Sequence, residues 1–388
     1  MGSRPRLSAI ALLLAAALLA TSVALARTGS SSSATTTAAR AASSGRAADI
    51  RRLTTDQLAG QRVIYAYAGL RPPASLLAAI RAGEAGGVIF FGSNISSLAQ
   101  IRGVITQLQR ASLAAPLHTR LLLLTDQEGG EVRRLPGGPV LSEKQIGQSR
   151  AAGSLARSAA TGAGRALAGV GMNVNLAPVL DVFRRPRNFI DQFQRSYSST
   201  PATVGALGAA FIAAQQQLGV AATAKHFPGL GAAGQSQNTD VQPVTLGLSL
   251  ARLRSADEAP YRSAIAAGLK LVMTSWAVYP ALDHRLPAGL SPAVIGGELR
   301  RRLGFRGVTI TDGIDAGGVT PYGNLARRSV LAAGAGADLI LCAAVNPAAN
   351  TPAQGITAMH AISAAIASRR ISKASAQQAA ARILALRS

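Results

Sequence analysis

Eight short apolar runs, each followed by a stretch long enough for a helix, constrain the fold of this 388-residue chain most. Most of the runs are continuously apolar, which is typical of parallel strands covered on both faces. The runs span residues 63–67, 87–91, 121–125, 173–178, 221–226, 271–275, 307–311 and 338–342. Eight repeats of strand and helix predict a single (β/α)8 TIM barrel, an α/β fold with a closed parallel sheet inside a ring of helices.

The segments between the runs have helical spacing of apolar residues. This spacing is found in Ala- and Leu-rich stretches at 97–111, 152–169, 203–218 and 292–303, and residues 372–387 predict a closing helix. A doubly wound open sheet is the alternative architecture, but no glycine-rich phosphate loop follows the first run. With 48% hydrophobic residues, the chain can bury a large core in one domain over residues 49–388.

Residues 1–26 have the composition of a signal peptide, and residues 27–48 have that of a linker. Arg4 and Arg6 precede an apolar run that ends in Ala-Leu-Ala, a pattern typical of cleavage by signal peptidase. The run is long enough that an uncleaved membrane anchor stays open as the alternative. The Ser/Thr/Ala-rich stretch that follows lacks apolar periodicity and predicts a disordered linker. We therefore expect an exported protein, extracellular or associated with the cell envelope.

The chain is strongly basic, with 40 Lys and Arg against 17 Asp and Glu, a net charge of +23. For an exported protein this charge predicts attraction to the anionic cell envelope, although a solvated arginine-rich surface explains it without any specific partner. Aromatic residues make up 4% and no basic helix is interleaved with them, so we expect no binding of nucleic acid.

Cys342 is the only cysteine, which excludes an intramolecular disulfide. We expect a monomer.

Ionisable residues gather at the carboxyl ends of the predicted strands, where the catalytic groups of this fold lie. The sequence DQEGG follows the third run at 126–130, KHFPG ends the fifth at 225–229, and TDG ends the seventh at 311–313. Asp181 and a loop with Arg195 follow the fourth run. A single Asp at such a position is as readily a helix cap. Four such positions on one face of a barrel indicate a common site, suited to a ligand with many hydroxyl groups.

These motifs resemble glycoside hydrolase family 3, specifically its single-domain bacterial β-N-acetylglucosaminidases. The similarity runs from GGVIFF at 86–91 to DLIL at 338–341, and it includes DQEGG, KHFPG and the LGFRGV of 303–308. It implies a retaining β-glycosidase that hydrolyses terminal β-N-acetylhexosaminides of cell-wall or related glycans through a glycosyl-enzyme intermediate. It implies a carbohydrate substrate and neither a metal nor an organic cofactor. A sugar-binding barrel with impaired catalysis and a β-glucosidase of the same family are the alternatives.

The resemblance also implies roles for particular residues. It makes Asp312 the catalytic nucleophile, and a carboxylate held at a strand end is the usual nucleophile at an anomeric carbon. Charged hydrogen bonds from Arg and Lys can fix ring hydroxyls, and a carboxylate can accept two. A structural salt bridge is the alternative role for each sugar-binding position. Those positions fall on Asp126, Arg134, Arg195, Lys225 and His226.

The loop after the fifth run departs from the family pattern. Family members carry Asp-Ser-His there, which supplies the general acid/base and its orienting carboxylate, whereas this chain has Asn238 at the histidine position. An amide cannot transfer a proton, and His118, His284 and His360 are expected at the surface. Asp240 is the candidate acid/base, since most glycosidases pair two carboxyl groups. The alternatives are a slow enzyme limited to good leaving groups and an Asp240 that serves only as a turn residue.

Overall fold

The computed structural model describes residues 2 and 49–387 of the chain. The signal peptide or anchor predicted for 1–26 and the linker predicted for 27–48 lie outside the described residues, apart from Gly2. Leu53–Ser388 form a unit of their own, which contains the barrel. Over the described part of the chain, every helix is too short or too polar to cross a bilayer.

Eight parallel strands close into a barrel, which confirms the predicted TIM barrel and excludes the open sheet. The barrel closes where the last strand pairs with the first, at Val63–Ile340 and Ile64–Leu341. Each predicted run contains or overlaps one strand. In chain order the strands are β1 (Val63–Tyr65), β2 (Gly87–Ile89), β3 (Leu122–Thr125), β6 (Val174–Asn175), β7 (Ala221–Phe227), β8 (Leu271–Thr274), β11 (Val308–Gly313) and β12 (Leu339–Leu341).

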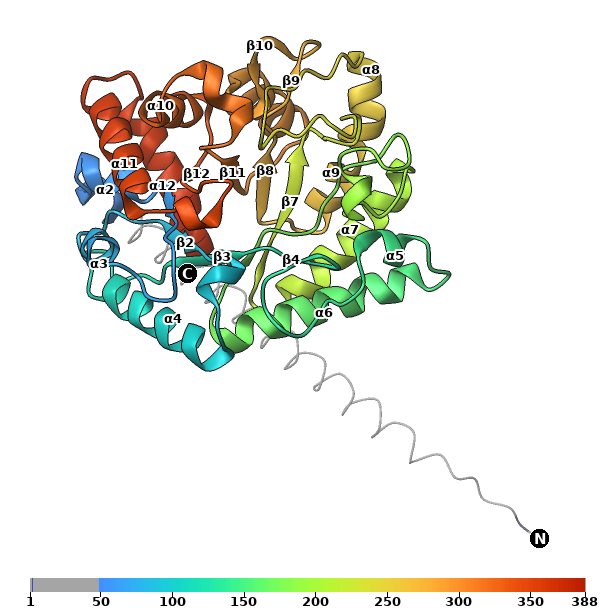
Figure 1. Cartoon of the computed structure of the whole chain (residues 1–388), viewed down its shortest axis with the longest axis horizontal. Helices are drawn as coiled ribbons and strands as arrows, with labels where there is room; N and C mark the ends of the chain where they lie inside the picture. The colour runs from blue at the N-terminus through green and yellow to red at the C-terminus, as the bar shows by residue number, and fades with distance from the viewer. Residues whose placement is uncertain (1, 3–48, 388) are drawn as a thin grey trace. The chain divides into compact units, whose positions relative to one another are not determined.

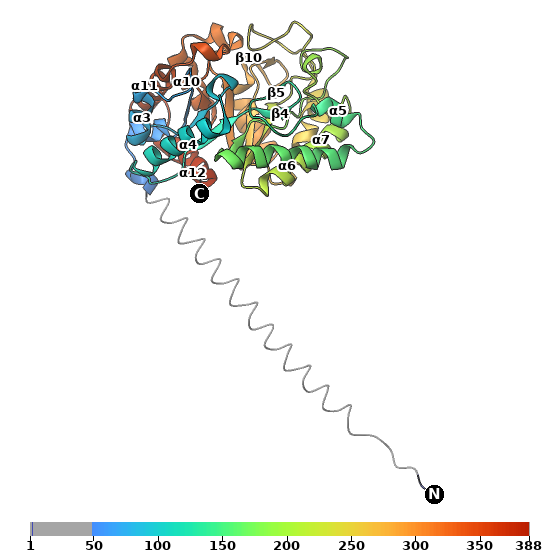
Figure 2. The ribbon, with the colours of Figure 1, turned by 60° about the horizontal axis from the view of Figure 1, so that its bottom comes forward.

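Helices surround the barrel (Figures 1 and 2). The longer ones are α3 (Ala74–Arg81), α4 (Leu98–Leu113), α6 (Ala152–Val170), α7 (Pro201–Gln216), α9 (Ala259–Ala266), α10 (Leu325–Ala335), α11 (Pro352–Ala367) and α12 (Lys373–Arg387), and the shorter ones are α2 (Thr55–Gly60), α5 (Glu143–Gly147) and α8 (Leu250–Arg252). The predicted helices at 97–111, 152–169, 203–218 and 372–387 correspond to α4, α6, α7 and α12. The predicted helix at 292–303 has the wider turns of a π-helix, over Ala293–Arg302.

Apolar side chains fill the inside of the barrel. Ile64, Leu124, Val174, Leu271 and Ile310 are among the fully or almost fully buried residues that pack there. Because such a core is close-packed, it fixes the strands relative to one another and gives a rigid floor to anything that binds above it. The strand ends, and the side chains that follow them, are therefore held in place by the core.

Two short β-hairpins follow strands of the barrel at their carboxyl ends. The hairpin β4 (Gln127–Gly129) and β5 (Val132–Arg133) follows β3, and the hairpin β9 (Val278–Tyr279) and β10 (Asp283–Pro287) follows β8. In Figure 1, β9 and β10 lie beyond the arrowhead of β7, at the end of the barrel where active sites of this fold are found.

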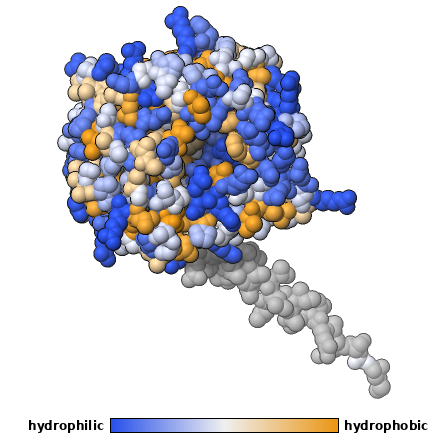
Figure 3. All heavy atoms as spheres, viewed as in Figure 1, coloured by the Kyte–Doolittle hydropathy of each residue, from blue (hydrophilic) through white to orange (hydrophobic). Residues whose placement is uncertain are grey.

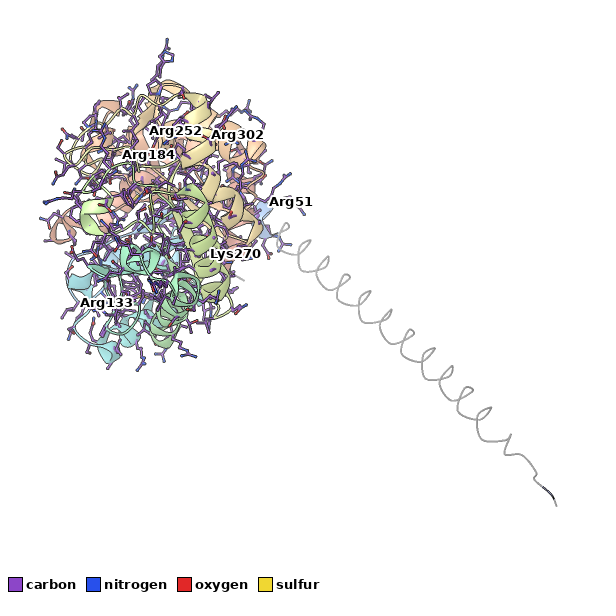
Figure 4. The ribbon with its side chains drawn as sticks, turned by 90° about the vertical axis from the view of Figure 1, so that its right-hand side faces the viewer. Arg51, Arg133, Arg184, Arg252, Lys270 and Arg302 are labelled. Atoms are coloured by element: carbon purple, nitrogen blue, oxygen red, sulfur yellow. The ribbon has the colours of Figure 1, made fainter. Side chains whose placement is uncertain are left out.

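The positive charge is spread around the barrel unit. Arg133, Arg252 and Lys270 lie on separate parts of it in Figure 4, and hydrophilic and hydrophobic residues are interspersed over the face seen in Figure 3. Some basic side chains are neutralised locally, as in the ion pair between Arg184 and Asp257. The basic residues labelled in Figure 4 are therefore not gathered in a single patch.

Candidate active site

A pocket of about 230 Å³ opens at the carboxyl ends of the barrel strands. Its floor is formed by Ile89, Leu176, Met273 and Leu341, which also belong to the core inside the barrel. Strand ends that are far apart in the sequence meet here because the sheet is closed. The pocket is lined by every residue that the sequence predicts for the site, namely Asp126, Arg134, Arg195, Lys225, His226, Asp240 and Asp312.

Buried Glu128 holds two of the cationic side chains in place. Arg195 donates two hydrogen bonds to it, from Nε to Oε2 and from Nη2 to Oε1, each 2.9 Å long. The Nζ of Lys225 lies 2.7 Å from Oε1 of Glu128. Burial alone would raise the pKa of Glu128, but Arg195 and Lys225 outweigh it and lower the pKa to about 2. Glu128 is therefore ionised at neutral pH, and its charge is shared by Arg195 and Lys225.

Lys225 bridges Glu128 and Asp126. Its Nζ also lies 2.7 Å from Oδ1 of Asp126. Burial lowers the pKa of Lys225, yet the two carboxylates raise it above the ordinary value, so the side chain stays an ammonium. Because an ammonium has three N–H donors and two face carboxylates, one is left for a ligand. Lys225 therefore forms a salt bridge and also lines the pocket, so the two alternative positions expected for it are both observed.

A second buried carboxylate, Asp181, orients His226. Its Oδ2 lies 2.7 Å from Nδ1 of the ring, and its Oδ1 accepts from the backbone N–H of Leu230 at 2.6 Å. Because Nδ1 faces the carboxylate, Nε2 is the ring nitrogen left for the pocket. Neither Asp181 nor Glu128 was among the residues predicted for the site. Their position directly after predicted strands is the signal that could have identified both.

Asp312 lies at the rim of the barrel, at the end of β11, with its side chain half-buried. Its Oδ1 accepts a hydrogen bond from the backbone N–H of Gly313 at 2.8 Å. The strand is held on one side by its pairing with β8 up to Thr311–Thr274, and Trp276 donates from Nε1 to the carbonyl of Gly313 at 2.8 Å. The carboxylate is thus presented to the pocket from a fixed backbone.

Asp240 reaches the same pocket from the loop after β7. Burial, and then the negative charge of Asp312, raise the pKa of Asp240 to about 6, although Arg195 and nearby cations act in the opposite direction. A carboxyl group with this pKa can give and take a proton near neutral pH. Asp240 also lies in a turn. Its place in the turn and its place in the pocket lining are therefore compatible.

The three histidines outside the KHFPG motif are too exposed to replace the missing loop histidine. His118, His284 and His360 are all exposed, as predicted, and none lines the pocket. Over the described residues, there is also no group of three or more His, Cys, Asp or Glu side chains that could hold a metal ion. The side chains that line the pocket carry carboxyl, ammonium, guanidinium and imidazole groups.

The pocket has one polar wall and one apolar wall. The polar residues lie in or after β3, β6, β7 and β11, whereas Phe91 follows β2 and Ala343, Ala344 and Val345 follow β12. Since β2 and β12 both neighbour β1 in the barrel, the apolar residues share one arc of the rim. A ligand that offers hydroxyls on one side and an apolar group on the other matches this division.

The fold and the site define a TIM barrel with a polar pocket at the carboxyl ends of its strands, and comparison with known families gives the class. The glycosyl hydrolase family 3 N terminal domain matches residues 25–386. The chain belongs to glycosyl hydrolase family 3 and is a glycoside hydrolase, which confirms the resemblance seen in its motifs.

Individual relatives agree with this family. An "uncharacterized secreted glycosyl hydrolase" of Arthroderma benhamiae is 46% identical over 331 residues, which cover 85% of this chain and 92% of the relative. A family 3 β-N-acetylglucosaminidase from a Paenibacillus species superposes with a TM-score of 0.80 at 35% identity, over 86% of this chain and 62% of that one. A β-N-acetylhexosaminidase from Beutenbergia cavernae gives 0.77 at 31% identity, over 86% and 98%.

Proposed function

We propose that this chain is a retaining β-glycosidase that releases terminal β-N-acetylhexosamine from cell-wall or related glycans. One observation carries the proposal: Asp312 and Asp240 line one pocket, and the pKa of Asp240 is raised to about 6. Most glycosidases that retain configuration use two carboxyl groups, one ionised and one able to donate a proton. The similarity to solved structures described as acting on N-acetylated sugars supports this substrate class.

In the first step, the carboxylate of Asp312 attacks the anomeric carbon and the bond to the leaving oxygen breaks. Asp240 gives its proton to that oxygen, so the aglycone departs as an alcohol. The sugar remains on Asp312 as an ester with inverted configuration. Asp240 is left as a carboxylate.

In the second step, Asp240 takes a proton from water while the water oxygen attacks the anomeric carbon and displaces Asp312. The second inversion restores the β configuration. The charge of Asp312 helps to raise the pKa of Asp240, and esterification removes that charge. The pKa of Asp240 therefore falls once the intermediate has formed, which suits its change from acid to base.

The walls of the pocket divide the recognition of the sugar. The polar wall, with Asp126, Arg134 and Lys225, offers charged donors and acceptors to ring hydroxyls. The apolar wall, with Phe91 and Val345, offers contact to the methyl of an acetamido group or to an apolar sugar face.

We also propose that the enzyme is exported and works as a monomer with one catalytic domain over residues 49–388. The composition of residues 1–26 and 27–48 supports a signal peptide or anchor followed by a linker. The relative from Arthroderma benhamiae, whose name includes "secreted", supports export. The net charge of +23 supports attraction to an anionic envelope.

A screen of matched 4-nitrophenyl glycosides tests the substrate class. We expect the wild type to cleave the β-N-acetylglucosaminide at least about tenfold faster, in kcat/KM, than the β-glucoside, since the pocket can bind the acetamido group. NMR of the first product formed should show the β anomer. A preference for the glucoside would indicate a β-glucosidase instead. Absence of turnover on both, with retained binding of N-acetylglucosamine, would indicate a sugar-binding barrel.

The pKa of Asp240 predicts the pH profile. Because the acid must be protonated, kcat/KM for an N-acetylglucosamine disaccharide should fall about tenfold per pH unit above pH 6. The raised pKa places this limb at higher pH than an ordinary Asp would. An activated dinitrophenyl glycoside, which needs no protonation of its leaving group, should lack the limb. A disaccharide profile that stays flat from pH 5 to about 8 would contradict the role of Asp240.

A further inference from the structure

The loop that carries Asp240 is held by hydrogen bonds to two other connections of the barrel. Near its start, the backbone N–H of Leu230 donates to Oδ1 of Asp181, and the carbonyl of Ala233 accepts from the N–H of Phe189 at 3.2 Å. Asp181 and Phe189 both belong to the connection after β6. The first half of the loop is therefore bound to one neighbouring connection of the barrel.

The second half is bound to the connection after β11, which begins at the nucleophile. The N–H of Gly317 donates to the carbonyl of Asp240 at 2.7 Å, and the N–H of Gly318 donates to the carbonyl of Thr239 at 2.9 Å. Thr239 is 2% exposed. Asp240 and its neighbour Thr239 are thus tied by backbone hydrogen bonds to residues five and six positions beyond Asp312.

Close approach explains why glycines stand at this contact. A Cβ on Gly318 would lie 2.6 Å from the carbonyl oxygen of Thr239, and a Cβ on Gly317 would lie 2.0 Å from that of Val241. Neither glycine has a positive φ, so the requirement is for space and not for an unusual backbone conformation. Any side chain here must push the loop with Asp240 away from the β11 connection.

Asn238 shapes the turn from within. Its Oδ1 accepts from the N–H of Asp240 at 2.8 Å, and its carbonyl accepts from the N–H groups of Val241 at 3.1 Å and Gln242 at 3.0 Å. An Asn side chain that binds the backbone two residues on is a recurring way to fix a tight turn. The amide of Asn238, which cannot transfer a proton, thus binds the backbone of Asp240, the proposed acid/base.

We propose that Asn238, Gly317 and Gly318 are positioning residues that hold the carboxyl group of Asp240 where it protonates the leaving oxygen. This inference rests on the proposed acid/base role of Asp240. Asn238 takes no proton itself; it fixes the turn that presents Asp240, and the two glycines fasten that turn to the loop of the nucleophile. A displacement of about 1 Å at a reacting group can reduce the rate on the order of 10²-fold.

The test compares substitutions that disturb the turn with matched ones that do not. Asn238→Ala removes the acceptor for the N–H of Asp240, and Gly318→Ala inserts a methyl group against Thr239. Asn238→Ser keeps an acceptor, and Gly247→Ala adds a methyl group to the same loop where nothing lies within 4 Å. The full chain is assayed with N-acetylglucosaminides of increasingly poor leaving groups, from dinitrophenyl through phenyl to a disaccharide.

We expect Asn238→Ala and Gly318→Ala to lower kcat/KM for the disaccharide about 10- to 100-fold. Both should stay within about threefold of the wild type on the dinitrophenyl glycoside, which needs no acid. Asn238→Ser and Gly247→Ala should follow the wild type on every substrate. A merely structural role would lower all rates together, so the dependence on the leaving group separates the two.

Two other results would overturn the inference in distinguishable ways. If Asp240→Asn impairs the disaccharide selectively but Asn238→Ala and Gly318→Ala do not, the acid is Asp240 and only the positioning role is wrong. If Asp240→Asn itself shows no selective loss, the acid role and the positioning role both fail. Should Gly318→Ala not fold, Asn238→Ala with its Asn238→Ser control decides alone.

Discussion

Asp312→Gly is expected to lower kcat/KM by about 10⁴-fold or more on activated and unactivated substrates alike. Without this carboxylate no covalent intermediate can form, so the quality of the leaving group does not help. Release of nitrophenol from an activated glycoside and of N-acetylglucosamine from a disaccharide measures the effect. Asp315→Asn is the matched control, because Asp315 belongs to the same connection but pairs with Arg328 at 3.3 Å and does not line the pocket.

Azide gives this substitution a stereochemical readout. In Asp312→Gly, the space left by the side chain admits a small anion, which attacks the anomeric carbon from the side that Asp312 occupied. One inversion then converts an activated β-glycoside into the α-glycosyl azide, which NMR identifies. Formation of the β-azide, or full activity without azide, would show that another group is the nucleophile.

Asp240→Asn is expected to separate substrates by their leaving groups. On a disaccharide kcat/KM should fall about 10²- to 10⁴-fold, the usual contribution of a general acid. On a dinitrophenyl glycoside kcat/KM should stay within about tenfold of the wild type. There kcat and KM should fall together, because the base for the second step is also lost and the glycosyl-enzyme accumulates. Steady-state kinetics on the two substrates measure the difference.

Asp126, a proposed sugar-binding residue, provides the contrast. Asp126→Asn should lower kcat/KM for both substrates to a similar degree, since Asp126 lines the pocket and pairs with Lys225 but is not the proposed proton donor. With Asp240→Asn, azide should yield the β-glycosyl azide, because the intermediate on Asp312 is intact and azide replaces water. Equal losses on both substrates for Asp240→Asn would remove Asp240 from the acid role.

The barrel could be predicted from the sequence because its signals are local. A continuously apolar run such as 221–226 and the helical spacing of 152–169 each fit within one element, and each reappears as β7 or α6. The π-helical turns of Ala293–Arg302 were not predicted, because a few apolar residues do not distinguish turns of slightly different width. The motif residues at strand ends could be placed on one face because every parallel strand of a barrel ends there.

The sequence by itself determined the alternation of strands and helices, the family motifs, and the loss of the loop histidine at Asn238. Only the tertiary structure decided that Glu128 holds Arg195 and Lys225, and that Gly317 fastens Asp240. These contacts join residues about 70 to 100 positions apart, and no local pattern records which partners meet. Closure of the sheet brings them together, and burial inside the closed site then sets the pKa of Asp240.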